Sequence, residues 1–250
     1  MLAELAHLRR NSRAPAGIGS DSILRCPAQV EMPLRAARFI PPNAPVHLID
    51  VGANDGQWAA SFLASFPNST AELWEPLPPL AEALRVRFRE NQRVKVIAAA
   101  ASSQSGTATI IQPAHDAMAS LHKYSDFIAT GAIHGTAKTI DVQTRQLDDV
   151  QRDLETRCVV LKVDAQGHEL EVLAGAIQTL NAVTLAIVEA SLGEMFDGRP
   201  PTFAAVCCSL ARHGLLPCMF PSAGTMFGIH PVEQDIMFVR RTDLFKLHTD

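Results

Sequence analysis

The chain has 250 residues, of which 47% are hydrophobic, enough for one domain with a sheet buried on both faces. A net charge of -4, without a run of Lys and Arg among aromatic residues, argues against nucleic-acid binding. No apolar stretch reaches the roughly 20 residues of a membrane span, and the five cysteines contain no Cys-x-x-Cys pair. These features predict a cytoplasmic protein with buried or incidental thiols.

The first 45 residues precede the first predicted strand. Residues 1–10 are predicted as a short amphipathic helix, residues 11–22 as a polar linker, and residues 32–39 as a second helix that ends before two prolines. We expect this segment to cap the sheet or to contribute to a homodimer. The main domain then comprises residues 46–250.

The segment from residue 46 to residue 56 (VHLIDVGANDG) is the most informative part of the chain. A short apolar run with Asp50 near its end opens into a turn that contains Gly52 and Gly56. Residues 57–63 have apolar side chains at helical spacing, so the turn also starts a helix whose free backbone N–H groups face a crevice. This pattern is typical of a buried parallel strand that ends at a small-molecule site.

The next predicted strand, residues 71–74, ends at Glu75 immediately before Pro76. An acid about 20 residues beyond a glycine turn is placed to accept hydrogen bonds from both hydroxyls of a ribose. The glycine pattern is Gly-x-x-x-Gly, which leaves one fewer close approach for a pyrophosphate than Gly-x-Gly-x-x-Gly does. The sequence therefore favours a nucleoside ligand without phosphates.

The middle of the chain contains a long irregular segment. A helix is expected at residues 80–91, a strand at 94–99 and a loop at 100–103. Further strands at 106–112 and 140–144 flank the irregular segment, which contains His115, Ser120, His122, Tyr124 and His134. Long inserts beside a crevice are more often substrate loops than simple connections, although any one of these histidines, taken alone, is more often a solvent-exposed loop residue.

The last third of the chain contains the segment with the most candidate catalytic residues. A buried strand, residues 158–163, ends at Asp164, and a turn through Gly167 leads past His168 into a helix at 170–180. The remaining elements are a strand at 182–187 followed by Glu189, a helix at 204–213, and strands at 215–220 and 234–240. Arg199, on the loop after Glu189, has the charge to bind an acidic acceptor, but a solvated loop arginine is expected.

Taken in order, these motifs resemble the FkbM-type S-adenosylmethionine-dependent methyltransferases. The resemblance covers most of residues 46–240 and rests on residues 49–56, 74–76, 144–149, 161–169, 172–176 and 187–189. It implies the class I methyltransferase fold, an α/β, Rossmann-like, doubly wound and mostly parallel seven-stranded sheet with an antiparallel last strand. It also implies O-methylation of a hydroxyl on a small molecule or sugar-containing metabolite, without naming the acceptor.

The expected S-adenosylmethionine site lies at the ends of the first two strands, with the loop after the third strand beside the adenine. Related enzymes often place an acid in that loop, whereas this chain has Ser102. The residues expected to bind the cofactor are Asp50, Gly52, Asn54, Gly56, Glu75, Pro76 and Ser102.

Methyl transfer is an in-line displacement in which the acceptor oxygen lies about 3 Å from the carbon, and an alcohol must also lose its proton. We expect His168 to act as the base and Asp164 to orient the hydroxyl or take the proton. A structural alternative is that Asp164 caps the helix and His168 only packs. The residues expected to contact the acceptor are Ser120, His122 and Glu189.

Three alternatives stay open. Mg²⁺ on Asp164, Glu169 and Glu189 would lower the pKa of a bound hydroxyl, but we expect no metal. A nicotinamide-dependent oxidoreductase would need a third glycine and a Tyr-x-x-x-Lys pair, and Tyr124, the one tyrosine, has no lysine four residues on. A non-catalytic nucleoside-binding domain would not need Asp164 and His168 together at one strand end.

Overall fold

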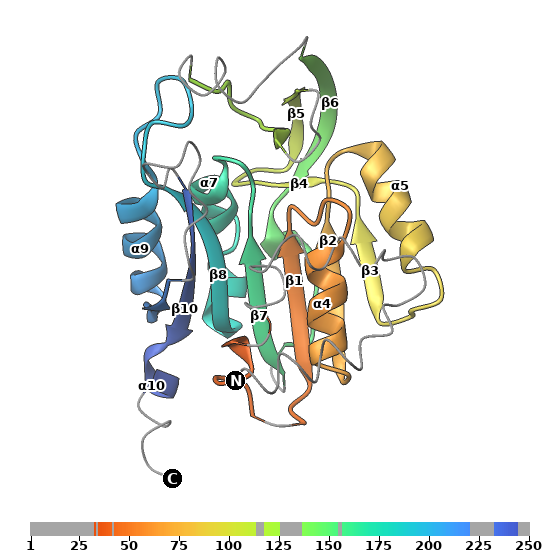
Figure 1. Ribbon diagram of the computed structural model, residues 1–250, viewed down its shortest axis with the longest axis vertical. Coiled ribbons are helices and arrows are strands. Elements are labelled where there is room, and N and C mark those ends of the chain that lie inside the picture. Colours follow the sequence, from red (N-terminus) through yellow and green to blue (C-terminus); the bar gives the residue numbers. More distant parts are fainter. Residues whose placement is uncertain are drawn as a thin grey trace, which may run out of the picture.

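The computed structural model describes residues 33–113 except 34 and 42, and residues 118–125, 137–154, 157–220 and 233–244. Its centre is a seven-stranded sheet in the order β3-β2-β1-β7-β8-β10-β9, with helices on both sides (Figure 1). The strands are β1 (Val46–Val51), β2 (Ser69–Trp74), β3 (Val94–Ile97), β7 (Cys158–Val163), β8 (Val183–Ser191), β9 (Leu215–Met219) and β10 (Glu233–Arg240). The predicted fold is confirmed, because β10 runs antiparallel to β8 and β9 while β3, β2, β1, β7 and β8 pair in parallel.

The side chains of β1 alternate between two hydrophobic cores, as the period of two in a strand requires. Leu48 packs in the core that contains Phe62 of the helix after β1, and Ala36 from the N-terminal segment joins the same core. Ile49 packs in the other core, which contains Leu173 from a helix on the opposite face. Both faces of the sheet are therefore covered, as expected for parallel strands.

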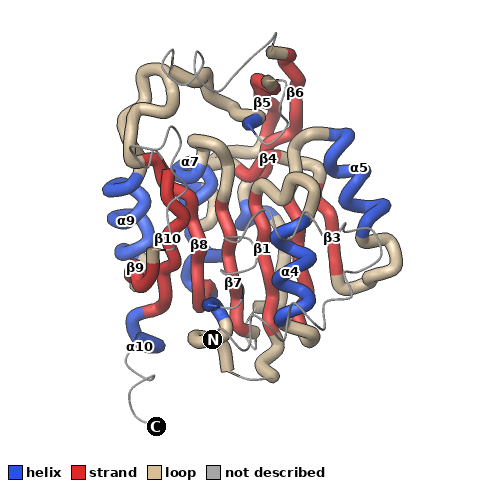
Figure 2. Tube along the Cα trace, in the orientation of Figure 1, coloured by secondary structure: helices blue, strands red, loops and turns tan. Residues whose placement is uncertain are grey.

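The helices are α4 (Gln57–Ser65), α5 (Pro78–Arg87), the 3-10 helix η2 (Leu147–Asp149), α7 (Glu169–Ala174), α8 (Ile177–Ala182), α9 (Phe203–Arg212) and α10 (Arg241–Leu244) (Figure 2). The helices that begin at residues 57, 78 and 203 follow the strands as the sequence predicts, whereas η2 and α10 were not predicted and the helix after β7 differs. The single helix predicted at residues 170–180 is wrong, because the chain breaks at Gly175. A Cβ at Gly175 would lie 2.0 Å from the carbonyl oxygen of Ser102, so the backbone at this break packs directly against the chain after the third strand.

A second sheet of three strands, in the order β4-β6-β5, covers the carboxyl edge of the main sheet (Figure 1). Its strands are β4 (Ala100–Ala101), β5 (Gly106–Gln112) and β6 (Lys138–Arg145). The loop predicted at residues 100–103 is therefore partly wrong, because Ala100 and Ala101 pair with β6. In the irregular segment, Ser120 bridges to β5 and Tyr124 bridges to Phe196, whereas His115 and His134 lie outside the described residues.

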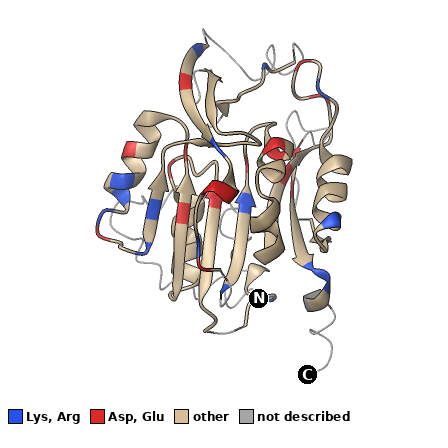
Figure 3. Cartoon of the chain, turned by 180° about the vertical axis from the view of Figure 1, so that it is seen from behind, with Lys and Arg blue, Asp and Glu red and all other residues tan. Residues whose placement is uncertain are grey.

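Charged residues of both signs are interspersed over the described elements (Figure 3). In the part of the chain that the structure describes, no helix has the length and apolar composition to cross a lipid bilayer. Cys158, Cys207, Cys208 and Cys218 are free thiols. The domain boundary at residue 45 stays a prediction.

Candidate active site

A cavity of about 440 Å³ lies at the carboxyl edge of the main sheet. Its walls come from the ends of β1, β2 and β7, from the chain around β4, and from one residue of β10, and residues 119 and 121 also line it. Parallel strands deliver their carboxyl ends to the same edge, so residues far apart in the sequence meet here.

The glycine turn brings the ends of three strands together. The backbone N–H groups of Gly52 and Ala53 donate to the carbonyl oxygen of Trp74 at 3.0 and 3.1 Å, which ties the turn to β2. A Cβ at Gly52, whose φ is 76°, would lie 1.9 Å from the carbonyl oxygen of Asp164. Any other residue at position 52 would push the end of β7 away from the cavity. Gly56 forms the N-terminal cap of α4 and does not line the cavity.

Glu75 is held rigidly in the cavity wall. Its Oε2 accepts the N–H of Asn54 and its Oε1 accepts the N–H of Leu77, each at 2.9 Å. Burial raises the pKa of Glu75 to about 7, and the two hydrogen bonds oppose that shift. Each carboxylate oxygen keeps a lone pair for a further donor, while Pro76 and Leu77 supply an apolar surface beside it. These residues fit the ribose and base of a nucleoside.

Asp50 does not line the cavity, although the sequence suggests that it does. The carboxylate is fully buried under the glycine turn, and its oxygens accept no hydrogen bond among the described residues. It forms an ion pair with Lys162, whose Nζ lies 3.5 Å from its Oδ1. Lys162 lines the cavity from β7, opposite Asp50 in the strand register. Sequence reasoning assigned Lys162 no role, but a lysine inside an otherwise apolar strand is the signal that marks it.

Asp164 lies in the cavity wall with its side chain 32% exposed. Its Oδ2 lies 3.3 Å from Nζ of Lys162, and its Oδ1 accepts a hydrogen bond from Nε2 of Gln166 at 2.9 Å. Burial favours the protonated acid, but Lys162 and the hydrogen bonds with Gln166 and Glu189 outweigh it and lower the pKa of Asp164 below its ordinary value. Asp164 is therefore ionised at neutral pH.

Asp164 does not cap α7, whose N-terminal residue His168 makes no side-chain capping hydrogen bond, and Glu169 binds the turn before the helix instead. One oxygen of Glu169 accepts the N–H groups of Ala165 and Gly167 at 3.1 and 3.0 Å, at the start of α7. Since Glu169 is directed onto the backbone, it does not join Asp164 and Glu189 in a three-carboxylate metal group among the described residues.

Two further carboxyl groups surround Asp164. Glu189 of β8 shares Gln166 with it, accepting from Nε2 at 3.0 Å, but does not line the cavity. Burial, and then the charge of Asp164, raise the pKa of Glu189 well above its ordinary value. Asp235 of β10, opposite Glu189 in the register, does line the cavity, and burial raises its pKa to about 6. Sequence reasoning missed Asp235, which only the antiparallel pairing of β10 brings to this edge.

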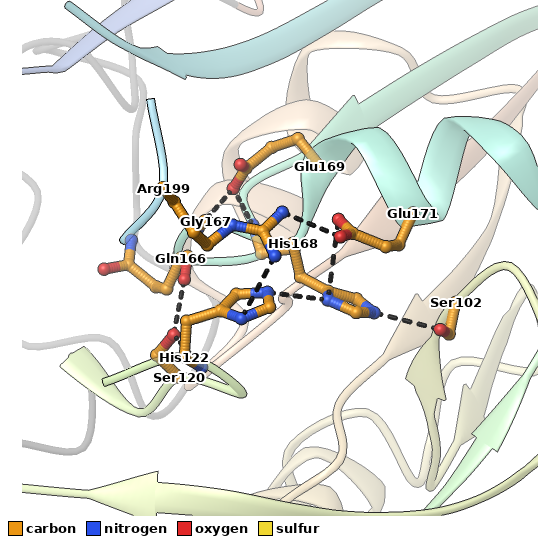
Figure 4. A network of polar contacts seen from close by, with 10 residues as sticks. Ser102, Ser120, His122, Gln166, Gly167, His168, Glu169, Glu171 and Arg199 are labelled. Carbon is orange, nitrogen blue, oxygen red and sulfur yellow. Dashed lines mark hydrogen bonds and ion pairs between the residues drawn. The ribbon is translucent and has the colours of Figure 1, made fainter. Parts of the chain in front are cut away.

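His168 lines the cavity and belongs to a chain of hydrogen bonds that joins Ser102, His122 and Arg199 (Figure 4). His168 Nε2 lies 2.9 Å from Ser102 Oγ, and its Nδ1 lies 3.0 Å from Nε2 of His122. Nδ1 of His122 lies 3.3 Å from Nη1 of Arg199. A guanidinium only donates, so Nδ1 of His122 accepts and its Nε2 carries the proton. His168 therefore accepts at Nδ1 and donates to Ser102 from Nε2.

This hydrogen-bond pattern leaves His168 without a free ring nitrogen. Burial lowers the pKa of His168 to about 4, so the ring is neutral at pH 7. His168 contributes to the cavity wall, but Ser102 is not among the lining residues. The contacts favour a positioning role for His168 over the general-base role expected from the sequence.

His122, His168 and Glu171 place one ligand atom each within 4.8 Å of one another, as metal ligands would. Arg199 argues against a cation there, because its Nη2 lies 2.7 Å from Oε1 of Glu171. A metal bound to Nε2 of His122 would move the ring proton to Nδ1, and Nδ1 could then no longer accept the hydrogen bond from Arg199. The expectation of a solvated Arg199 is wrong, since its side chain is only 28% exposed and pairs with Glu171.

Ser120 and His122 do not line the cavity, whereas their neighbours Ala119 and Leu121 do. Ser120 is buried, and its Oγ donates to the carbonyl oxygen of Gln166 at 2.6 Å. This bond fixes the irregular segment to the turn after β7. The contacts of Ser120 and His122 with an acceptor stay a prediction.

Residues 50–214 match the family described as Methyltransferase FkbM domain. A relative, the 2-O-methyltransferase NoeI of Sinorhizobium fredii (strain NBRC 101917 / NGR234), is 27% identical over 162 residues, or 62% of this chain and 67% of that protein. Precorrin-6y C5,15-methyltransferase from Geobacter metallireducens GS-15 is a structural neighbour with a TM-score of 0.45 and 13% identity, covering 84% of this chain and 88% of that one. Magnesium protoporphyrin IX methyltransferase (ChlM) from Synechocystis PCC 6803, with bound SAM, has a TM-score of 0.46 and 10% identity, covering 94% and 91%.

Proposed function

Because the chain belongs to the FkbM methyltransferase family and is an S-adenosylmethionine-dependent methyltransferase, we propose that it methylates a hydroxyl oxygen on a small molecule or sugar-containing metabolite. The observation that carries this proposal is that Glu75 and Asp164 line one cavity from different strand ends. One carboxylate suits a ribose and the other suits an acceptor hydroxyl. The relative's designation as a 2-O-methyltransferase supports transfer to oxygen.

At the donor end of the cavity, defined by Asn54, Glu75, Pro76 and Leu77, the chain binds the nucleoside part of S-adenosylmethionine. Glu75 accepts hydrogen bonds from the ribose hydroxyls, and the apolar residues pack against the base. The cofactor supplies an activated methyl group. Ser102 does not line the cavity, and it accepts a hydrogen bond from His168.

At the acceptor end, defined by Trp58, Asp164, Gln166 and Asp235, the chain binds and orients the alcohol. Asp164 accepts the hydrogen bond of the attacking hydroxyl and takes its proton as the methyl carbon exchanges its bond to the sulfonium sulfur, which keeps the electron pair, for a bond to that oxygen. Holding the oxygen in line with the carbon supplies much of the acceleration. Several carboxyl groups at one end of a cavity suit a sugar, whose hydroxyls donate hydrogen bonds.

The test is incubation of the purified protein with S-adenosylmethionine labelled in its methyl group and with parallel panels of methyl glycosides, phenols, amines and thiols. Mass spectrometry and product fragmentation locate the label. The proposal predicts label on a hydroxyl oxygen, with methyl glycosides as the best panel. Label on nitrogen, sulfur or carbon would contradict O-methylation.

We also propose a cytoplasmic location, which the free thiols support.

A further inference from the structure

Lys162 is a buried cation next to Asp164. It lies in β7, whose other residues are apolar except for Cys158. Its side chain is 8% exposed, and its Nζ lies between Oδ1 of Asp50 and Oδ2 of Asp164. The same ammonium lies 5.9 Å from the ring centre of Trp58, close enough for a cation–π contact.

The groups that face Lys162 and Asp164 are mostly acids. Asp50 lies on β1, Glu189 on β8, and Glu233 and Asp235 on β10. Glu169, at the start of α7, also interacts with Asp164. Burial disfavours the charge of Lys162, but Asp164, Asp50, Asp235 and Glu189 outweigh it and raise the pKa of the lysine. Lys162 therefore stays charged.

Asp164 is held on both oxygens, since Lys162 contacts its Oδ2, Gln166 donates to its Oδ1, and Glu189 also forms a hydrogen bond with it. Two contacts on different oxygens set the plane of a carboxylate, whereas one contact leaves it free to rotate. Among the described residues, Lys162 is the one positively charged residue within ion-pair distance of Asp50. The pair of Asp50 and Lys162 thus acts as a buried support for Asp164.

We propose that Lys162, anchored by Asp50, is the positioning residue that holds the carboxylate of Asp164 in place for the acceptor hydroxyl. This inference rests on the proposed function, because it assigns Asp164 to the acceptor. Lys162 acts through Asp164 and takes no proton itself. Asp50, which the sequence suggested as a cofactor ligand, then serves the acceptor end of the cavity.

The test uses a charge-balanced variant, because Lys162→Met alone would leave Asp50 buried without its partner. Asp50→Asn/Lys162→Met removes both charges and keeps similar volumes. In protein labelled with ¹³C at aspartate carboxyls, the Asp164 signal is assigned by its loss in Asp164→Asn. The proposal predicts that its titration midpoint rises by roughly 1–3 pH units in the charge-balanced variant. Lys95→Met, at an exposed lysine on β3, is the matched control and should leave the midpoint unchanged.

Turnover at saturating S-adenosylmethionine supplies the second readout. The charge-balanced variant should lose activity about tenfold to a hundredfold, with its acid limb moved to higher pH, and should bind S-adenosylhomocysteine normally. In an Asp164→Asn background the same two substitutions should cause no further loss. An unmoved Asp164 titration in the folded variant, or fully additive losses, would overturn the proposal. Because the titration needs no acceptor, a chain that methylates no hydroxyl yet shows the shift refutes the proposed function alone.

Discussion

At the donor end of the cavity, Glu75 is held by backbone N–H groups of Asn54 and Leu77. At the acceptor end, Asp164 is held by side chains, those of Lys162 and Gln166. Backbone contacts come with the strand and its turn, whatever the neighbouring side chains are. Side-chain contacts depend on which residues other strands deliver to the same edge. The two ends should therefore respond differently to substitution.

The largest effect is expected for Asp164→Asn. The variant keeps the shape of the side chain but loses the negative charge that we propose accepts the hydroxyl proton. Turnover at saturating donor should fall about 10²–10⁴-fold, while the dissociation constant of S-adenosylhomocysteine stays within twofold. Steady-state kinetics and calorimetry check the two values, and wild-type turnover in this variant would remove Asp164 from the chemistry.

The second effect, at the donor end, is expected for Glu75→Ala. Loss of hydrogen bonds from two ribose hydroxyls to a charged acceptor should weaken donor binding by roughly 1.5–3 kcal/mol, about tenfold to a hundredfold. Glu82→Ala, at an exposed glutamate of α5, is the matched control and should bind normally. Equal affinities of the two variants for S-adenosylhomocysteine would place the ribose elsewhere.

A smaller effect is expected for His168→Ala. Because both ring nitrogens of His168 are already bonded to Ser102 and His122, turnover should fall less than about tenfold, below the usual range for loss of a general base. Loss of the ring leaves buried partners unsatisfied, so the free energy of unfolding should fall by about 1–3 kcal/mol. Urea denaturation measures the stability. A turnover loss as large as that of Asp164→Asn would restore the general-base role.

The contrast between local backbone contacts and long-range side-chain contacts also decides how much of the site the sequence predicts. The sequence predicts that Gly52 and Glu75 lie at the cavity, because a strand, a turn and the next strand end are close in sequence and local patterns encode them. The sequence does not show that the side chain of Asp50 is buried beside Lys162. Side chains of a strand alternate between its two faces, and only the register of β1 with β7 shows that Lys162 is the partner of Asp50. The helix break at Gly175 was missed because its cause is a distant backbone contact with Ser102. Arg199 and Asp235 likewise take their roles from long-range neighbours.

The smallest effect is a pH dependence of donor binding. Burial raises the pKa of Glu75 to about 7, and ribose hydroxyls that donate to its carboxylate favour the ionised form. Binding should then release protons near pH 7, and affinity should rise a few-fold as pH rises through that value, reaching its plateau above it. Calorimetry of S-adenosylhomocysteine in buffers of different ionisation enthalpy measures the released protons. Glu75→Gln should abolish the release, and proton uptake by the wild type would reverse the assigned sign.

The central claim is that the two carboxylates serve separate ends of one cavity. Single-turnover methyl transfer, followed at increasing S-adenosylmethionine in Glu75→Ala and Asp164→Asn, tests it most directly. The account predicts that high donor concentration restores the transfer rate of Glu75→Ala to near the wild-type value and leaves Asp164→Asn slow at every concentration. Two variants with the same deficit at saturating donor would contradict the division of roles.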